Sequence, residues 1–291
     1  MTHTHSHPTH AAEQHGHPHS SAADGQAELL DLDAQVLARH TGSVIDWLPL
    51  GEDPREIVDL GCGTGAGTFA LLSRFPQARV TAVDSSDEHL VRLREKARAA
   101  GLEERVRTVR ADLDQAEWPD LGTPDLVWSS AALHHMADPD RALRQVHGLI
   151  APGGLLAVVE LSGFPRFLPA DAPEDRPGLE ERCHAAGDHK YAGHLPHRGA
   201  DWGPKLTAAG FSLEGERTIT VNAGSSEDEA VGVYALSALR RIRHGVADAL
   251  APEDLAALDR LLDTGGPHSI LLRDDLAVRT ERTVWAARRG A

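Results

Sequence analysis

The sequence predicts an α/β fold with a mostly parallel sheet, and three observations in the first half of the chain support this. Residues 57–60 form a short apolar run carrying one acid, as in a buried parallel strand. Glycines follow at Gly61, Gly63 and Gly65. Residues 68–75 are then apolar at helical spacing. A strand, a glycine turn and a helix in this order place a nucleotide-like ligand against a helix N-terminus.

Length, charge and cysteine content limit the class of protein. The 291 residues suffice for one large domain, which we place at 27–291. Cys62 and Cys183 are the only cysteines, so we expect no disulfide framework and a reducing cytosol. No apolar stretch approaches a membrane-spanning length, and the N-terminus lacks a signal-peptide core, so we expect a cytoplasmic protein without a membrane partner. The net charge of -15 argues against a nucleic-acid partner.

Residues 1–26 are mainly His, Thr, Ser, Ala and Gly, and we expect a disordered tail. The tail carries seven histidines: His3, His5, His7, His10, His15, His17 and His19. Metal capture is the functional interpretation of such a tail. Nothing rigid fixes a coordination geometry, so we favour a solvated tail.

Residues 27–48 carry apolar side chains at helical spacing and predict one or two amphipathic helices. Pro49, Gly51 and Pro54 then break the chain before the first strand. We therefore expect an N-terminal helical cap at 27–53. Its apolar face can cover a ligand pocket or simply pack on the sheet, and the sequence leaves both open.

The second and third strands each end in an acid. Residues 79–84 are the second strand, and Asp84 lies 19 residues after Gly65, the spacing of a carboxylate that binds both hydroxyls of a ribose. We expect Asp87 to cap the following helix. Residues 105–113 are the third strand and its exit, which carries Asp112 and Leu113.

The fourth and fifth strands frame the segment where an open sheet presents its ligand. Residues 124–130 are the fourth strand, followed by Leu133-His-His-Met-Ala-Asp-Pro139. Asp138 and Pro139 look like an N-cap and first helical residue. Pro152-Gly-Gly154 then precedes the fifth strand at 155–160.

Taken together, these motifs resemble one family. Ile57-Val-Asp-Leu-Gly-Cys-Gly-Thr-Gly65 fits every position of the first motif of the class I S-adenosylmethionine-dependent methyltransferases, which runs apolar-apolar-acid-apolar-Gly-x-Gly-x-Gly. The Leu-His-His-x-x-Asp-Pro and Pro-Gly-Gly segments resemble its small-molecule (type 11/12-like) branch. The resemblance covers about residues 55–163. It implies a Rossmann-like sheet of seven mostly parallel strands with helices on both faces, and S-adenosyl-L-methionine as cofactor.

The resemblance also assigns site residues. An acid at position 59 would attract a sulfonium and repel a pyrophosphate. By resemblance, Asp112 meets the adenine amino group and Leu113 packs on the ring. The small Cys62 between motif glycines needs no nucleophilic role. The expected cofactor contacts are Asp59, Gly61, Cys62, Gly63, Gly65, Asp84, Ser85, Asp112, Leu113 and Ser129.

The second half of the chain is less informative. Residues 164–200 are rich in Pro, Gly, His and charge, and we expect a lid or acceptor loop rather than a metal site, because the His and Cys spacings are irregular. Residues 201–224 and 271–291 complete the sheet. Residues 225–270 are a helical insertion near the C-terminus.

Methyl transfer is an in-line displacement in which the protein mainly positions a small-molecule acceptor. His134 and His135 are the candidate bases, if the acceptor must lose a proton. The methylated atom, O, N, C or S, stays open, as does a homodimer. One alternative, a nicotinamide-dependent oxidoreductase, is disfavoured by Asp59, by Asp112 and by the missing Tyr-x-x-x-Lys spacing. A regulatory protein that binds the cofactor without turnover is another. A metal-handling protein led by the His-rich tail is a third.

Overall fold

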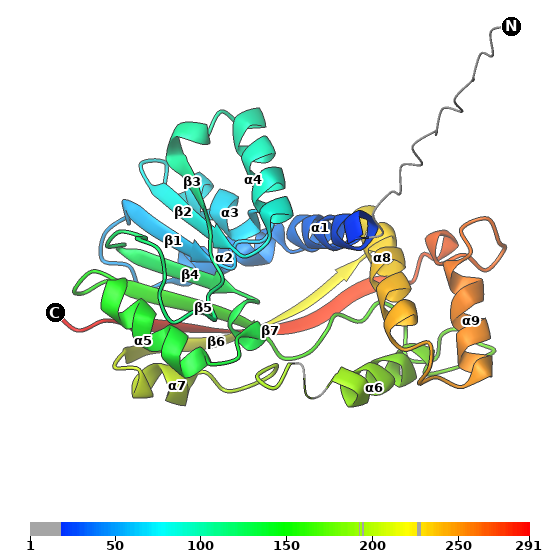
Figure 1. Cartoon of the computed structure of the whole chain (residues 1–291). Helices are drawn as coiled ribbons and strands as arrows, with labels where there is room; N and C mark the ends of the chain where they lie inside the picture. Colours follow the sequence, from blue (N-terminus) through cyan, green and yellow to red (C-terminus); the bar gives the residue numbers. More distant parts are fainter. Residues whose placement is uncertain (1–18, 192, 194, 226–227) are drawn as a thin grey trace, which may run out of the picture.

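The computed structural model of the chain describes residues 19–191, 193, 195–225 and 228–291, which form a seven-stranded sheet flanked by helices (Figure 1). The strand order is β3-β2-β1-β4-β5-β7-β6. The strands are β1 (Glu56–Leu60), β2 (Arg79–Asp84), β3 (Val106–Arg110), β4 (Leu126–Ser130), β5 (Leu155–Leu161), β6 (Ser212–Gly224) and β7 (Ala277–Arg288). The first five run parallel, whereas β7 is antiparallel to β5 and β6. The predicted fold class is therefore confirmed.

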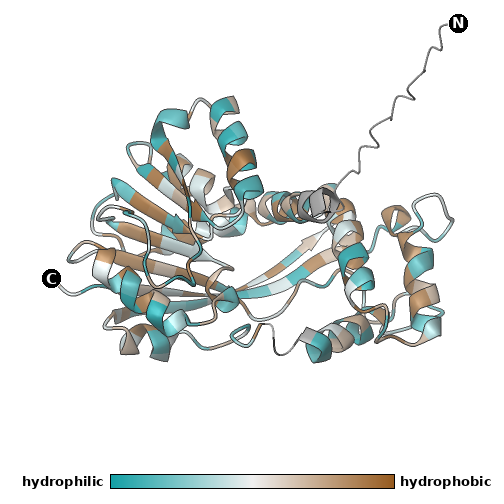
Figure 2. Ribbon diagram, in the orientation of Figure 1, coloured by the Kyte–Doolittle hydropathy of each residue, from teal (hydrophilic) through white to brown (hydrophobic). Residues whose placement is uncertain are grey.

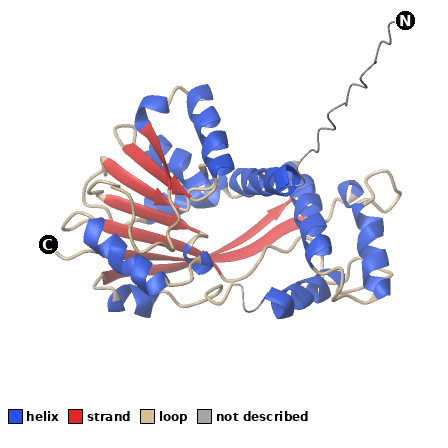
Figure 3. Cartoon of the chain, viewed as in Figure 1, coloured by secondary structure: helices blue, strands red, loops and turns tan. Residues whose placement is uncertain are grey.

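Helices alternate with the strands along most of the chain (Figure 3). They are α1 (His19–Val36), α2 (Ala38–Trp47), α3 (Ala66–Arg74), α4 (Asp87–Ala99), α5 (Pro139–Leu149), α6 (Leu179–Tyr191), α7 (Gly203–Ala208), α8 (Ala230–Gly245) and α9 (Pro252–Leu262). Three short 3-10 helices are η1 (Glu103–Arg105), η2 (Leu133–His135) and η3 (Ile270–Leu272). Helices α8 and α9 fall between β6 and β7, which is the predicted helical insertion.

Two apolar layers enclose the sheet because successive side chains of a strand point to opposite faces. Ile57 joins the layer built with α2 and α3, and its neighbour Val58 joins the layer with α5 and α7. The burial of both faces explains why the central strands are hydrophobic along most of their length (Figure 2). It also explains why a polar side chain in these strands is conspicuous.

Beyond the sheet, α6, α8, α9 and η3 form a helical lobe with its own core, reached by the long strands β6 and β7 (Figure 1). Asp254, at the start of α9, is 3% exposed and accepts hydrogen bonds from Arg176 (2.6 Å) and Arg182 (2.8 and 2.9 Å). These hydrogen bonds connect α9 to α6, through Arg182, and to the segment that precedes α6, through Arg176. The interval 164–200, expected to be a loop, thus contains a helix that belongs to this lobe.

Two local expectations differ from the structure, and a third concerns residues that the structure does not describe. Helix α1 begins at His19, so residues 19–26 are helical rather than part of a disordered tail. Helix α4 is capped by the hydroxyl of Ser86, and Asp87 instead pairs with Arg110 at 2.8 Å. The tail 1–18, with six of the seven expected histidines, lies outside the described residues. Within the described ranges, no helix is both long and apolar enough to cross a membrane.

Candidate active site

The glycine turn after β1 is wedged between the exits of two neighbouring strands. The backbone N–H groups of Gly61 and Cys62 donate to the carbonyl of Val83 at the end of β2 (2.8 and 3.0 Å). Gly61 has a φ of 70°, and a Cβ added there would lie 2.4 Å from the Cβ of Ala132, just past β4. Only glycine permits both this backbone angle and this approach. The turn therefore brings the carboxyl ends of β1, β2 and β4 to one point.

Asp84 at the end of β2 faces this turn. Its Oδ2 accepts the N–H of Gly63 at 2.9 Å, and its Oδ1 accepts the N–H of Ser86 at 2.8 Å and lies 3.3 Å from Nδ1 of His89. Burial raises the pKa of Asp84, but the hydrogen bonds from His89, Ser86 and Gly63 outweigh it and lower the pKa below its ordinary value. The carboxylate is therefore ionised at neutral pH, beside bare glycine backbone.

Asp59 was expected to face the ligand, but its side chain does not face an open site. It is 2% exposed, and its Oδ2 accepts a hydrogen bond from Thr68 of α3 at 2.6 Å. Burial raises its pKa to about 7, against the lowering effect of Thr68. At neutral pH the side chain is thus only about half ionised. The partial ionisation of Asp59 weakens the argument that this side chain attracts a sulfonium. Its hydrogen bond with Thr68 instead joins β1 to α3.

The remaining expected cofactor contacts lie in different environments. Asp112 is exposed after β3, where it accepts hydrogen bonds from Gln115 (2.9 Å) and from the N–H of Asp114 (2.9 Å), which lower its pKa. Leu113 next to it is 9% exposed. The N–H of Ala111 donates to the carbonyl of Asp84 at 3.0 Å, so the residue before Asp112 lies beside Asp84 in space.

Two expected contacts are buried, and one is exposed. Ser129 is fully buried in register with Leu60 and Val158, and its hydroxyl has no hydrogen-bond partner. Cys62 is 6% exposed, and burial raises the pKa of its thiol well above the ordinary value. It is therefore protonated and unsuited to nucleophilic attack. Ser85 is exposed at the end of β2.

Glu160, which no sequence motif singled out, organises the segment after β4. Its Oε1 accepts the N–H groups of Ala132 (3.1 Å) and Leu133 (2.8 Å), and its Oε2 lies 2.6 Å from Nδ1 of His134. Ala131 in the same segment has a φ of 53°, the one positive value for a non-glycine in the described part of the chain. An acid at the end of the otherwise apolar run 155–160 was the signal that could have found Glu160.

The two candidate bases divide between interior and surface. His134 is 2% exposed and held by Glu160, whereas His135 is exposed. Their ring centroids lie 4.1 Å apart. Although His135 is exposed to solvent, partial desolvation of its ring by the surrounding residues, and then the neighbouring His134, lower its pKa, while Glu160 acts in the opposite direction. His135 is therefore neutral at pH 7 and able to accept a proton.

Helix α1 covers the glycine turn. A Cβ on Gly63 would lie 3.2 Å from Cδ1 of Leu30, so the leucine rests against the bare backbone of the turn. Asp31 accepts a hydrogen bond from Thr64 in the turn (2.5 Å), and it pairs with Arg92 (2.7 Å) and Lys96 of α4. These contacts place α1 against the glycine turn and α4. Among the described residues, no three His, Cys, Asp or Glu side chains form a metal-binding group.

The comparisons with known proteins agree with this geometry. A family described as "Methyltransferase domain" matches residues 57–154, from β1 to the turn before β5. The trans-aconitate 2-methyltransferase of Mycolicibacterium gilvum is 32% identical over 223 residues, which cover 74% of this chain and 81% of that protein. The chain belongs to the class I S-adenosylmethionine-dependent methyltransferases. Its cofactor is accordingly S-adenosylmethionine, and the nicotinamide-dependent alternative is not favoured.

Two further comparisons define how far this methyltransferase resembles its relatives. The trans-aconitate 2-methyltransferase of Methylobacterium radiotolerans is 39% identical over 125 residues, 43% of this chain and 42% of that protein, so the chain spans less than half of that relative's length. The crystal structure of the [4+2]-cyclase SpnF aligns with a TM-score of 0.52 at 23% identity, over 87% of this chain and 81% of the cyclase. At that identity the likeness concerns the fold alone.

Proposed function

We propose that this methyltransferase transfers a methyl group from S-adenosylmethionine to a small-molecule acceptor by in-line displacement. The observation that carries the proposal is the meeting of three strand ends at one point. Asp84 accepts the N–H of Gly63 at 2.9 Å, and Gly61 leaves no space for a side chain against Ala132. A carboxylate therefore lies beside a stretch of bare backbone at the edge of the sheet where α/β folds bind ligands.

These residues fit an adenosyl cofactor. The positive φ angles of Gly61, Gly63 and Gly65 (70°, 52° and 98°) keep the turn close to its neighbours without side chains. The ionised Asp84 accepts hydrogen bonds from the ribose hydroxyls. Asp112 and Leu113 hold the adenine, and the cap helix α1 keeps water from the turn. When bound, the cofactor supplies a methyl group that is already activated by its sulfonium.

The segment after β4 positions the acceptor and, where required, removes its proton. His135 is the candidate base because it is exposed and its pKa is lowered, so that it is neutral at pH 7. His134 is a positioning residue that acts through His135: Glu160 holds it at 2.6 Å, and its ring lies against that of His135. Alignment of donor and acceptor contributes roughly 7–11 kcal/mol to such reactions.

The acceptor in two relatives is named as trans-aconitate. For this chain we propose a small-molecule acceptor. We also propose that the protein works in a reducing cytosol, since Cys62 and Cys183 are both free and buried. A homodimer stays an expectation, and light scattering of the purified protein tests it.

Titration calorimetry tests the proposal. Wild type is titrated with S-adenosylmethionine, S-adenosylhomocysteine and NAD, and the adenosyl ligands are then titrated into Asp84→Ala. We expect micromolar binding of both adenosyl ligands, no binding of NAD, and roughly thirtyfold weaker binding in the variant. The control is Asp87→Ala, which removes an exposed acid three residues away and should bind as wild type does.

Equal affinity in Asp84→Ala and Asp87→Ala would contradict the assigned role of Asp84, and failure of wild type to bind either adenosyl ligand would contradict the function. Cofactor binding without release of S-adenosylhomocysteine across a broad acceptor panel would instead favour a regulatory protein.

A further inference from the structure

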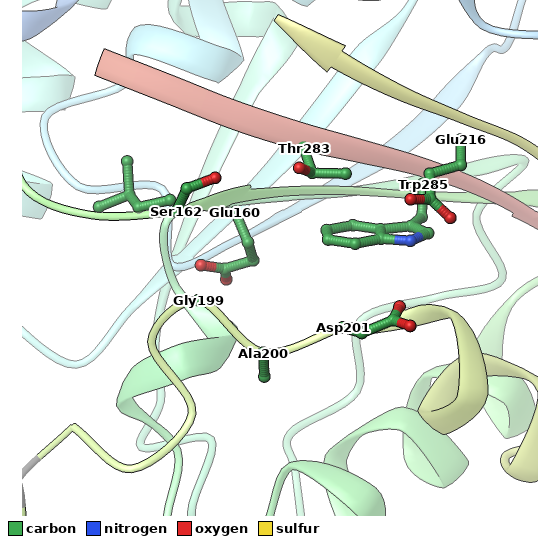
Figure 4. A pocket seen from close by; sticks show the side chains of 9 residues that line it. Glu160, Ser162, Gly199, Ala200, Asp201, Glu216, Thr283 and Trp285 are labelled. Atoms are coloured by element: carbon green, nitrogen blue, oxygen red, sulfur yellow. The ribbon is translucent and has the colours of Figure 1, made fainter. Parts of the chain in front are cut away.

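A cavity of about 310 Å³ opens at the carboxyl end of β5, beside the candidate active site (Figure 4). The end of β5 and the adjoining stretches of β6 and β7 form one wall, and the loop before α7 forms the other. The lining residues are Glu160, Leu161, Ser162, Gly199, Ala200, Asp201, Glu216, Thr283 and Trp285. The volume lies at the lower end of the range for small-molecule sites in proteins.

The charge of the lining is one-sided, because three of its nine residues are acidic and none is basic. Glu160 is 3% exposed and already accepts hydrogen bonds from the segment after β4. Asp201 and Glu216 are exposed, and Asp201 uses one oxygen to accept the N–H of Gly203 at 2.9 Å. An anionic group entering this cavity would be repelled, whereas a cation would be attracted.

Trp285 provides an independent observation that points to a ligand. It is 4% exposed, yet its Nε1–H has no hydrogen-bond partner. Trp285 lies in register with Val158 on one side and Glu216 on the other. A Cβ added to Gly203 would lie 3.6 Å from Nε1 of Trp285 and 3.2 Å from Oδ1 of Asp201, so the indole nitrogen and this carboxylate both lie near Gly203, and both residues line the cavity. A buried N–H donor costs free energy unless something accepts from it.

We propose that this cavity binds an ammonium group of the methyl acceptor, with an oxygen atom beside it that accepts from Trp285. The inference rests on the proposed function and narrows it to amino-alcohol-like acceptors. Glu216 and Asp201 attract the ammonium, and the face of Trp285 adds a cation–π contribution. The ammonium anchors the acceptor, and the methylated atom is another one, because a protonated nitrogen has no free electron pair.

Glu160 connects this cavity to the reaction site. The same carboxylate that lines the cavity holds the N–H groups of Ala132 and Leu133 and the ring of His134. An acceptor anchored here therefore lies next to the segment that carries His135. A tricarboxylate such as trans-aconitate would meet three carboxylates and no cation in this cavity, so the acceptor class should differ from that of the named relatives.

The experiment follows the indole resonance of Trp285 in a ¹H–¹⁵N spectrum of the full chain, assigned by its loss in Trp285→Phe. The probes are trans-2-aminocyclohexanol and its uncharged analogue trans-1,2-cyclohexanediol. We expect the amino alcohol to shift the Trp285 resonance saturably and the diol to leave it unchanged. Glu216→Gln and Asp201→Asn should each weaken binding of the amino alcohol roughly tenfold. Glu104→Gln, which removes an exposed charge at the opposite edge of the sheet, should bind as wild type does.

An equal response to both probes, no response to either, or undiminished binding in both acidic-residue variants would overturn the inference. Calorimetry with S-adenosylmethionine is a separate readout of the proposed function. If the cofactor binds and an ammonium-bearing acceptor is methylated equally well by Glu216→Gln and wild type, the inference fails while the function stands. If the amino alcohol binds but the cofactor does not, the cavity still binds an ammonium group, but its role as the acceptor site of a methyltransferase is overturned.

Discussion

Oε2 of Glu160 lies 2.6 Å from Nδ1 of His134, and both side chains are at most 3% exposed. The other carboxylate oxygen accepts two backbone N–H groups from the segment after β4. One side chain at the end of β5 thus determines the position of the neighbouring strand's exit, where an open α/β sheet binds its ligand.

Replacing Glu160 should destabilise the fold more, the more hydrogen-bond acceptor oxygens the substitution removes. We expect Glu160→Ala to lower the free energy of unfolding by about 3–5 kcal/mol, because it leaves buried donors of Ala132, Leu133 and His134 without a partner. Glu160→Gln keeps one carbonyl oxygen and should cost less than half as much. Urea denaturation measures both. Glu104→Ala at an exposed position should stay within about 0.5 kcal/mol of wild type, and an equally small effect of Glu160→Ala would refute this account.

His135 should control the acidic limb of the pH–rate profile. The base must be neutral to accept a proton, and the pKa of His135 is lowered from 6.5. We therefore expect kcat/KM for an acceptor that must lose a proton to fall only as the pH drops below 6.5. His135→Gln should lose roughly 10²–10⁴ in kcat and the limb with it. His244→Gln, an exposed histidine on α8, is the matched control. A limb that persists unchanged in His135→Gln would assign it to another group.

Asp59 should make the protein less stable as the pH rises from about 4 to 7. Its pKa is raised from 3.8 to about 7 by burial, so the folded chain binds a proton that the unfolded chain releases across this window. The shift corresponds to at most about 4 kcal/mol. Asp59→Asn keeps an acceptor for Thr68 and removes the titration. Denaturation curves recorded between pH 4.5 and 8 should show the variant gaining stability relative to wild type as the pH rises, and a constant difference across that range would exclude the effect.

Gly61 and Gly153 form a matched pair for testing the turn. Both have a positive φ, 70° and 77°, but a Cβ on Gly61 would lie 2.4 Å from Ala132, whereas one on Gly153 would meet nothing within 4 Å. Gly153→Ala should cost about 1 kcal/mol from backbone strain alone. Gly61→Ala should cost about 2–4 kcal/mol and also abolish binding of S-adenosylmethionine, because the exit of β4 must move. Calorimetry and denaturation of both variants check this, and equal behaviour of the two would refute the steric argument.

The N-terminal half of the molecule could be predicted because its signals are local. Val58 and Gly61 lie in a short apolar run followed by glycines, and helix capping by Asp138 was readable from its position before Pro139. The cap of α4 was misplaced by one residue because Ser86 and Asp87 are both good N-cap residues, and only the backbone angles distinguish them.

The site residues likewise fall into those with a local sequence signal and those whose contacts form only in the fold. The position of Asp84 beside the glycine turn was predictable because it lies at a fixed distance along the chain from that turn. Glu160, Leu30 and Trp285 were not assigned, because their partners lie 26 or more residues away and sequence spacing carries no information about such contacts. Asp59 was misread in one respect: the sequence shows an acid near the turn, but not that α3 buries it.

The sequence by itself determined the order of elements, the glycine turn and the family, since each depends on residue types at short spacings. The tertiary structure alone decided which histidine is accessible, which acid organises the exit of β4, and that three acids and an indole share one cavity. Burial and hydrogen bonding determine the protonation state and the accessibility of a side chain. Burial and hydrogen bonding in turn depend on residues that only folding brings together.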